Sequence, residues 1–125
     1  MVGEEFLMSV SPSFQTFVVD QLSRVVQRVR ARRMFGGVGI YSGESFFALI
    51  ADDTLYFKVD DSNRGDFEAR QMGPFQPYGP GGEVMQYYQV PNDLLEDVEA
   101  LRPWAEKALV VAARKKPERS GRGSA

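Results

Sequence analysis

The chain has 125 residues, of which 43% are hydrophobic and 26% charged, so its length fits one domain and its composition a folded one. It contains no cysteine and no histidine. This excludes disulfides, thiolate nucleophiles, histidine-based catalytic triads and zinc sites built from these residue types. The first residues are acidic, and no apolar run approaches the roughly 20 residues that span a bilayer. We therefore expect a cytoplasmic protein without a membrane segment.

The net charge of −2 hides an uneven distribution of charge along the chain. Residues 1–113 hold 10 Lys/Arg and 16 Asp/Glu, a balance of −6, whereas residues 114–125 hold five bases and one acid, a balance of +4. The last segment has no apolar side chain larger than those of alanine and proline, which is typical of a disordered segment. We expect a folded domain over residues 1–113 and a disordered basic tail over 114–125.

A first helix is predicted at about residues 12–30. Ser11 and Pro12 are typical of a helix start, and apolar side chains then recur at three- and four-residue steps as far as Val29. The second half of this segment and the residues that follow it carry five bases without an intervening acid. They are Arg24, Arg28, Arg30, Arg32 and Arg33.

The apolar pattern then changes to that of strands joined by short turns. Three strands at about 34–41, 46–51 and 54–60 predict an antiparallel meander. A short helix over 64–72, strands over 75–78 and 84–90, and a closing helix from residue 91 complete the order α-β-β-β-α-β-β-α. Pro103 predicts a break or kink near Arg102, because proline lacks the N–H that a helix interior needs. The predicted fold class is α+β, with two layers and helices packed on a five-stranded antiparallel sheet.

The centre and the end of the chain carry a distinctive combination of motifs. They are Arg33-Met34-Phe35-Gly36-Gly37-Val38-Gly39-Ile40-Tyr41, then Phe47-Ala48-Leu49-Ile50, Asp52-Asp53 and Leu55-Tyr56-Phe57-Lys58, and finally Met85-Gln86-Tyr87-Tyr88-Gln89-Val90-Pro91 with Leu101, Trp104 and Ala108. In this combination the chain resembles the TfoX/Sxy N-terminal domain family over residues 13–113.

The resemblance implies a two-layer domain with a five-stranded antiparallel sheet and a role in regulation. Longer members of the family regulate bacterial natural competence genes alongside the cyclic-AMP receptor protein, and they carry a second, C-terminal domain. Here only the twelve-residue basic tail follows the closing helix. We therefore expect a stand-alone N-domain that acts as a non-enzymatic regulatory or protein-interaction module connected with transcription regulation. No catalytic residue and no cofactor is implied, and a homodimer remains an alternative.

Two basic regions are the predicted sites of partner contact. They are the helix face with Arg24, Arg28, Arg32 and Arg33, and the tail bases Arg114, Lys115, Lys116 and Arg119. A protein partner, such as a component of the transcription machinery, is expected there, and weak direct binding of nucleic acid is the alternative. A third interpretation is a solvated face that keeps the protein soluble.

A structural role is predicted for the glycine-rich motif. The group comprises Met34, Phe35, Gly36, Gly37 and Gly39, with Trp104 from the closing helix. A phosphate-binding loop would place its glycines at the start of a helix, whereas these precede a strand. We expect a β-bulge or a close approach of the first helix to the first strand.

Two further groups of polar residues invite a chemical interpretation. The pairs Asp52-Asp53 and Asp60-Asp61 flank one strand and are roughly 20 Å apart at 3.3 Å per residue, so they are interpreted as turn formers and no metal site is predicted. Tyr56, Lys58, Tyr87, Gln86 and Gln89 are expected on one sheet face. That patch fits a binding surface, and a small enzyme that uses Lys58 and Tyr56 is the alternative.

Overall fold

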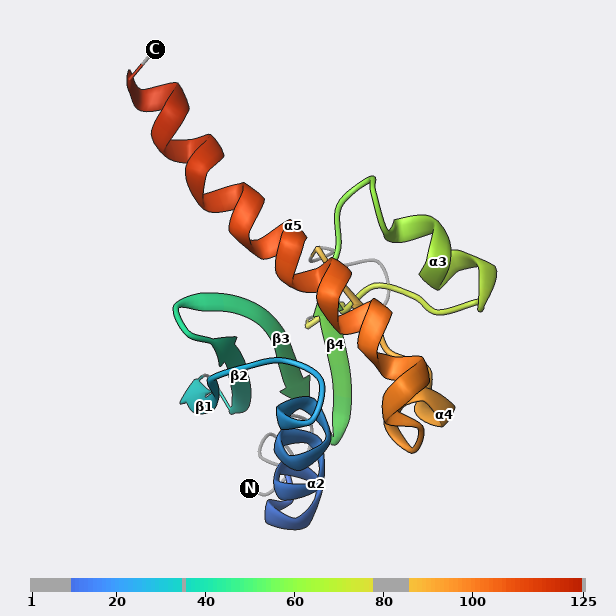
Figure 1. Ribbon diagram of the computed structural model, residues 1–125. Coiled ribbons are helices and arrows are strands. Elements are labelled where there is room, and N and C mark those ends of the chain that lie inside the picture. Colours follow the sequence, from blue (N-terminus) through green and yellow to red (C-terminus); the bar gives the residue numbers. More distant parts are fainter. Residues whose placement is uncertain (1–9, 35, 78–85, 125) are drawn as a thin grey trace.

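The computed structural model describes residues 10–34, 36–77 and 86–124, and of residues 115–124 it describes the backbone only (Figure 1). The elements in chain order are α2 (Pro12–Ser23), β1 (Val29–Met34), β2 (Gly37–Ser42), β3 (Ser45–Ala51), β4 (Thr54–Lys58), α3 (Arg64–Ala69), β5 (Tyr87–Gln89), α4 (Asn92–Leu95) and α5 (Val98–Ser124).

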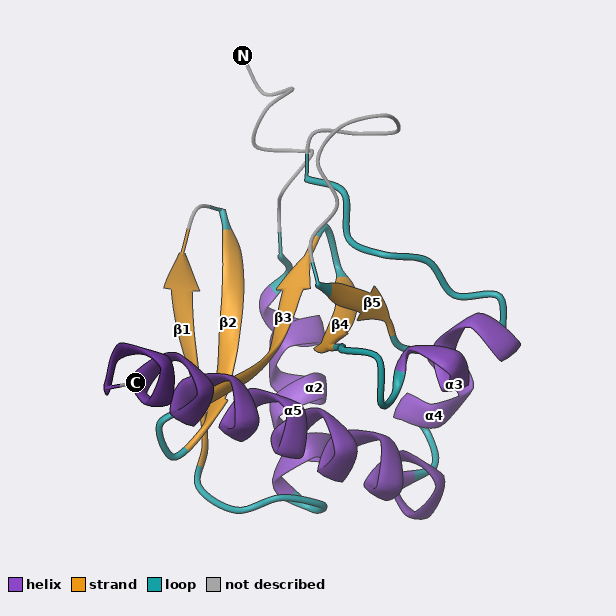
Figure 2. Cartoon of the chain, turned by 90° about the horizontal axis from the view of Figure 1, so that it is seen from above, coloured by secondary structure: helices purple, strands orange, loops and turns teal. Residues whose placement is uncertain are grey.

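The strands form one open antiparallel sheet in the order β1-β2-β3-β4-β5, so neighbours in the sequence are neighbours in the sheet (Figure 2). The predicted α+β class with a five-stranded antiparallel sheet is confirmed. The predicted turn between β3 and β4 is also confirmed, because Asp52 and Asp53 have φ values of 53° and 51°. Two positive φ angles in a two-residue loop are typical of a tight hairpin whose twist matches that of its strands.

The core lies on one face of the sheet, beneath α2 and α5. Alternate positions of β2, β3 and β4 place Val38, Ile40, Ile50, Leu55 and Phe57 there, each at most 2% exposed. The helices add their own apolar stripes to the same cluster. They contribute Val18 and Leu22 from α2 and Leu101, Ala105 and Ala108 from α5.

A β-bulge adds one more large side chain to this core. Ile40 pairs with Ala48 and Tyr41 with Phe46, so Phe47 is the additional residue on β3. Phe47 is fully buried, with its ring 5.9 Å from that of Phe57. The bulge thus allows adjacent residues of β3 to enter the core, which strict alternation would forbid.

The predicted helix over residues 12–30 is wrong in its second half. Helix α2 ends at Ser23, and the backbone of Arg28 has a φ of 53°. Val25, Val26 and Val29 are β-branched and disfavour a helix. Two hydrogen bonds fix the turn that replaces it, from the Gly43 N–H to the Arg28 carbonyl (2.9 Å) and from the Ser42 hydroxyl to the Gln27 carbonyl (2.6 Å).

Residues 29–34 consequently form an edge strand that the sequence did not reveal. The segment predicted as the first strand, 34–41, contains the turn between β1 and β2. Alternation along β1 exists, but three of its six residues are exposed arginines, and Ala31 between them is exposed as well. Hydrophobic periodicity, the main sequence signal for a strand, is therefore weak there.

The predicted strand over residues 75–78 is also wrong, as far as the described residues reach. Only an isolated bridge between Pro74 and Tyr88 occurs there, and Tyr78 lies outside the described residues. Proline cannot donate to a sheet, which keeps the segment irregular. Of the strand predicted over 84–90, β5 comprises Tyr87–Gln89, and residues 84 and 85 lie outside the described part.

The break in the closing helix lies at Glu96 and Asp97 rather than near Arg102. Asp97 starts α5, since its carbonyl accepts from the Leu101 N–H (2.9 Å) and its carboxylate from the Ala100 N–H (3.3 Å). Helix α5 then continues through Pro103. Its backbone also crosses the predicted domain boundary at residues 113 and 114 and runs on to Ser124, and Figure 1 shows the last turns projecting beyond the body.

Two neighbouring glycines of β2 provide a matched test of packing. A Cβ on Gly37 would lie 2.7 Å from the Ile50 carbonyl oxygen, which is backbone, whereas a Cβ on Gly39 would lie 2.7 Å from the terminal methyl of Met34. We expect Gly37→Ala to lower the free energy of unfolding by about 1–3 kcal/mol, and Gly39→Ala by less, because the Met34 side chain can move. Urea denaturation of both variants measures this; equal losses would contradict the packing described.

Candidate functional site

The second face of the sheet carries a row of aromatic and polar side chains, and no helix in the described part packs on it. The strand register places Leu49, Tyr56 and Gln89 side by side, and likewise Lys58 next to Tyr87. We call this surface the open face. It consists of Arg30, Arg32, Tyr41, Phe46, Leu49, Tyr56, Lys58, Tyr87 and Gln89.

Ring contacts link the members of the open face. Tyr41 stacks on Phe46 at 5.0 Å between ring centroids, and Phe46 lies 5.7 Å from Tyr87. Lys58 Nζ is 3.3 Å from the Tyr87 hydroxyl oxygen, to which it donates. The Arg30 guanidinium lies 4.6 Å above the centre of the Tyr41 ring. The face is therefore built from aromatic rings with cations held at their surfaces.

The structure brings together four of the five residues that were predicted to share a face. Tyr56, Lys58, Tyr87 and Gln89 lie on the open face. Gln86 does not, because the register that pairs Lys58 with Tyr87 sets it opposite Val59, whose side chain is buried in the core. Its carbonyl accepts a hydrogen bond from the Val59 N–H at 3.0 Å.

Two tyrosines of the open face, Tyr56 and Tyr87, hold their protons firmly. Burial, and then the neighbouring Tyr41, raise the pKa of Tyr87 to about 12. Burial, and then the charge of Asp52, also raise the pKa of Tyr56 above its ordinary value. Both phenols are therefore protonated at neutral pH, and neither serves there as a general base.

The arginines of residues 24–33 do not form a helix face, and that prediction is wrong. Arg24 follows the end of α2, and Arg28 lies in the turn before β1. Arg30, Arg32 and Arg33 belong to β1 itself. The chain turns after α2, so Arg28, Arg30, Arg32 and Arg33 lie in β1 or in the turn that leads into it, and Arg24 stays at the end of α2. We call the set of Arg24, Arg28, Arg30, Arg32 and Arg33 the arginine edge.

Ion pairing separates the arginine edge from the other bases. Five ion pairs join described residues, and their bases are Arg64, Arg70, Arg102, Lys107 and Arg114. No member of the arginine edge has an acidic partner within 4.0 Å in residues 10–34, 36–77 and 86–114. Arg30 instead donates to the Gly43 carbonyl at 3.2 Å.

The first base of the predicted tail is part of the body. Arg114 pairs with Asp60 at 3.0 Å and lies 3.5 Å from the Ser62 hydroxyl, which is within reach of a weak hydrogen bond. The side chains of Lys115, Lys116 and Arg119 lie outside the described part of the chain. Contact of these bases with a partner stays a prediction, as it does for the arginine edge.

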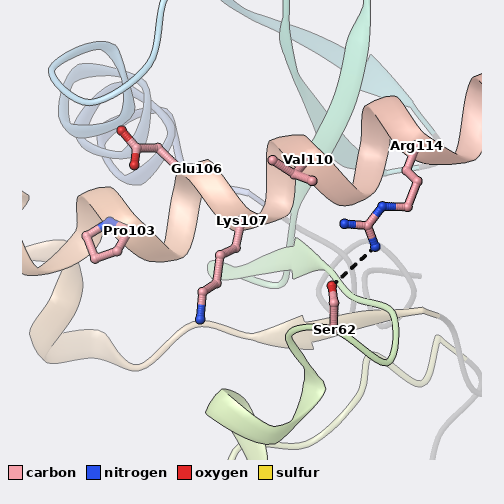
Figure 3. A pocket seen from close by; sticks show the side chains of 6 residues that line it. All are labelled: Ser62, Pro103, Glu106, Lys107, Val110 and Arg114. Atoms are coloured by element: carbon pink, nitrogen blue, oxygen red, sulfur yellow. Dashed lines mark hydrogen bonds between the residues drawn. The ribbon is translucent and has the colours of Figure 1, made fainter.

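A shallow cavity of about 380 Å³ lies between α5 and the segment that precedes α3 (Figure 3). Its lining residues are Ser62, Pro103, Glu106, Lys107, Val110 and Arg114. Both of its bases already face acids, since Lys107 pairs with Asp66 at 2.7 Å and Arg114 with Asp60. The sequence did not reveal this hollow, because its lining comes from separate elements. Lys58 and Tyr56, the residues of the alternative enzyme hypothesis, do not line it.

The glycine motif forms the hairpin between β1 and β2. Gly36 has a φ of 82°, which suits glycine in a tight turn. Gly37 leaves room for the Ile50 carbonyl, and Gly39 for the side chains of Met34 and Phe46. The close approach thus comes from β3 and from β1 rather than from the first helix, and Phe35 lies outside the described residues.

Trp104 packs edge-on against Phe67, with ring centroids 4.8 Å apart, and so fixes α3 to α5.

The aspartate pairs form turns at the two ends of β4. Within the described ranges, no group of three or more Asp, Glu, His or Cys side chains is arranged to hold a metal ion. The search for membrane spans found no described helix both long and apolar enough to cross a bilayer.

The architecture defines a two-layer α+β domain with helices on one side of an antiparallel sheet. The family model of the TfoX N-terminal domain matches residues 20–112, and the chain therefore belongs to that family. The match begins inside α2 and ends near the last core residue of α5, so it covers the whole sheet. No curated protein matches this chain.

The raised pKa of Tyr87 predicts a loss of stability in alkaline solution. Between pH 10 and 12 the unfolded chain releases this proton while the folded chain keeps it, so the free energy of unfolding falls as the pH rises. The stabilisation is complete below pH 10 and amounts to about 3 kcal/mol. Tyr87→Phe has no proton to release, and its denaturation midpoint should fall less steeply across this range. Parallel pH profiles for both proteins would contradict the assignment.

Proposed function

We propose that this TfoX N-terminal domain is a non-enzymatic regulatory module that binds a protein partner through the arginine edge, in a process connected with transcription regulation. The observation that carries the proposal is the lack of ion pairing at this edge. The body is acidic, with 16 acids against 10 bases over residues 1–113. Five other bases pair with acids, yet the arginines of the edge have no acid within reach in the described part.

A cluster of unpaired like charges disfavours folding slightly, because its members repel one another. An acidic partner would remove that repulsion on binding and would be guided to the edge over a distance of about 8–10 Å at moderate salt. Arginine is also enriched at protein interfaces, where its planar group pairs with carboxylates through two parallel hydrogen bonds. These properties support binding to protein rather than a purely solvated surface.

The chemistry of the open face supports binding over catalysis. Tyr56 and Tyr87 carry raised pKa values and are poor proton acceptors at neutral pH. Lys58 contacts the Tyr87 hydroxyl and the face of its ring. The aromatic row therefore serves as a firm platform beside the arginine edge.

Direct binding of nucleic acid is the second candidate, since unpaired arginines also suit phosphates. It makes a distinct prediction about salt. The affinity for a duplex would fall by orders of magnitude between about 50 and 200 mM salt if several phosphates were contacted. The affinity for a protein partner that is held partly by apolar and backbone contacts would depend less on the salt concentration.

Replacement of the predicted contact residues tests the proposal. The variant R24A/R28N/R32A/R33A removes four charges, and asparagine is chosen at position 28 because it tolerates the positive φ found there. We expect capture of native partners from a cell extract to fall about tenfold or more, with thermal stability changed little.

The matched control is R64A/R70A/R102A/K107A, which removes the same number of charges from bases that pair with acids on the exposed surface. It should retain capture of the same partners. Equal loss in both variants would show a general effect of net charge and would contradict a specific role for the arginine edge.

Removal of residues 115–125 tests the tail. The segment has no apolar side chain larger than those of alanine and proline, and Arg114, which pairs with Asp60, is retained. We expect an unchanged melting temperature together with weaker capture, since the four bases of this segment add to attraction at long range. A melting temperature lowered by several degrees would show that the tail packs on the body.

A further inference from the structure

The two edges of the sheet differ in whether they are covered. Along β5, residues 73–75 lie against the outer edge, with hydrogen bonds from the Gln89 N–H to the Gly73 carbonyl (3.0 Å) and from the Phe75 N–H to the Tyr87 carbonyl (2.7 Å). Along β1, no described segment pairs with the outer edge. The open edge of the sheet is thus the strand that carries the arginines.

The register shows which backbone groups of β1 point outward. The Gly43 N–H donates to the Arg28 carbonyl, so this pair is hydrogen-bonded across the β1–β2 ladder. Hydrogen-bonded pairs alternate along an antiparallel ladder, so Arg30 and Arg32 also direct their N–H and C=O groups at β2. Val29, Ala31 and Arg33 therefore present theirs to the outside.

We infer that an extended segment of a partner protein, with Asp or Glu at alternating positions, pairs with the outer edge of β1 as a sixth strand. This inference rests on the proposed function and names the partner chemistry of the same site. Backbone groups at Val29, Ala31 and Arg33 supply the hydrogen bonds, and charge supplies the selectivity, as in other cases of strand addition.

The alternation of side chains along β1 determines which positions of the added strand carry the acids. Arg30 pairs with Tyr41 and Arg32 with Gly39, so both arginines lie on the open face. Side chains of an added strand directly opposite them would have Cβ atoms about 4.5–5.5 Å away. The acids are therefore two residues apart. The residue between them lies opposite Ala31, toward the helix side, where a small or apolar side chain fits beside Val29.

The arrangement of Arg30 favours this occupant. Its guanidinium is held by the Tyr41 ring and by the Gly43 carbonyl, so less side-chain freedom is lost on binding. Arg32 faces Gly39 on β2, where the ends of the Met34 and Phe46 side chains fill the place of the missing side chain. One arginine is thus fixed in place, and the next is exposed beside the apolar ends of Met34 and Phe46.

A second copy of this chain fits the edge poorly. Antiparallel pairing of two β1 strands through their outward residues sets arginine against arginine in every central register. Pairing about Ala31, for example, places Arg30 opposite Arg32 of the other copy. Like charges in directly opposed positions destabilise a sheet. Nucleic acid also fits less well, since phosphates only accept hydrogen bonds and would leave the outward carbonyls unpaired.

Amide hydrogen exchange measured by NMR on the full chain tests the inference. The probe is a capped hexapeptide that alternates glutamate and valine, and its control has lysine in place of glutamate. With the acidic peptide at saturation, exchange at Val29, Ala31 and Arg33 should slow at least about tenfold. The amides of Arg30 and Arg32, already paired with β2, should change little. The lysine peptide should protect none of them, and protection by both peptides would overturn the charge requirement.

Variants separate strand pairing from charge. Ala31→Pro removes an outward N–H without touching the ladder to β2, and Ala31→Ser is its matched control. We expect about a tenfold loss of peptide affinity for the proline variant, none for the serine variant, and a similar loss for R30A/R32A. If the NMR spectrum shows that the proline variant does not fold, strand pairing is tested by the amide exchange pattern of the unmodified chain with the two peptides.

The remaining outcomes overturn the inference in distinguishable ways. Full binding by Ala31→Pro with loss in R30A/R32A would mean docking by charge without an added strand, and the proposed function would stand. If both variants bind the acidic peptide fully, or if the unmodified chain does not bind it at all, the inferred addition of an acidic strand is wrong. The capture experiment would then still test the proposed role of the arginine edge. Tighter binding of an oligothymidylate, without protection of the three outward amides, would assign the edge to nucleic acid.

Discussion

The burial of one sheet face beneath α2 and α5 is the constraint on which the rest of the molecule depends. Because side chains alternate along a strand, directing Val38, Ile40 and Ile50 into the core sends Tyr41 and Leu49 to the opposite face. The described helices pack on the first face only. The open face is therefore a direct consequence of where the apolar residues lie, and its aromatic rings pack against one another instead of against a helix.

The same geometry decides where the charges can act. Acids and bases along α3, α4 and α5 find one another across the helical layer, as Lys107 and Asp66 do. The edge strand β1 lies outside that layer, and the acids that would neutralise its arginines are not near it in the described part. A row of arginines on an edge strand also protects a monomer from self-association. The proposed pairing with an acidic strand would use the same row of like charges that disfavours pairing of this edge with its own copy.

Sequence patterns predicted the strands with apolar alternation and failed where alternation was polar. Leu55, Phe57 and Val59 identified β4, and the aspartate pair between β3 and β4 identified a tight turn. β1 was missed because Val25 and Val29 also fit helical spacing. Residues 75–78 are predicted as a strand because their aromatic residues have high strand propensity, whereas the described part of this segment is irregular next to an isolated bridge at Pro74. The break before α5 depends on the capping of Asp97, a weaker local signal than a proline.

The sequence by itself determined the fold class, the family and the identity of the basic residues, because these follow from local periodicity and from residue types in order. Only the tertiary structure decided that the arginines lie on an open strand edge rather than on a helix, and that they lack acidic partners among the described residues. The direction of the backbone groups of Val29, Ala31 and Arg33 likewise depends on the pairing of β1 with β2. Register and ion pairing join residues distant in the chain, and no local pattern encodes which of them meet.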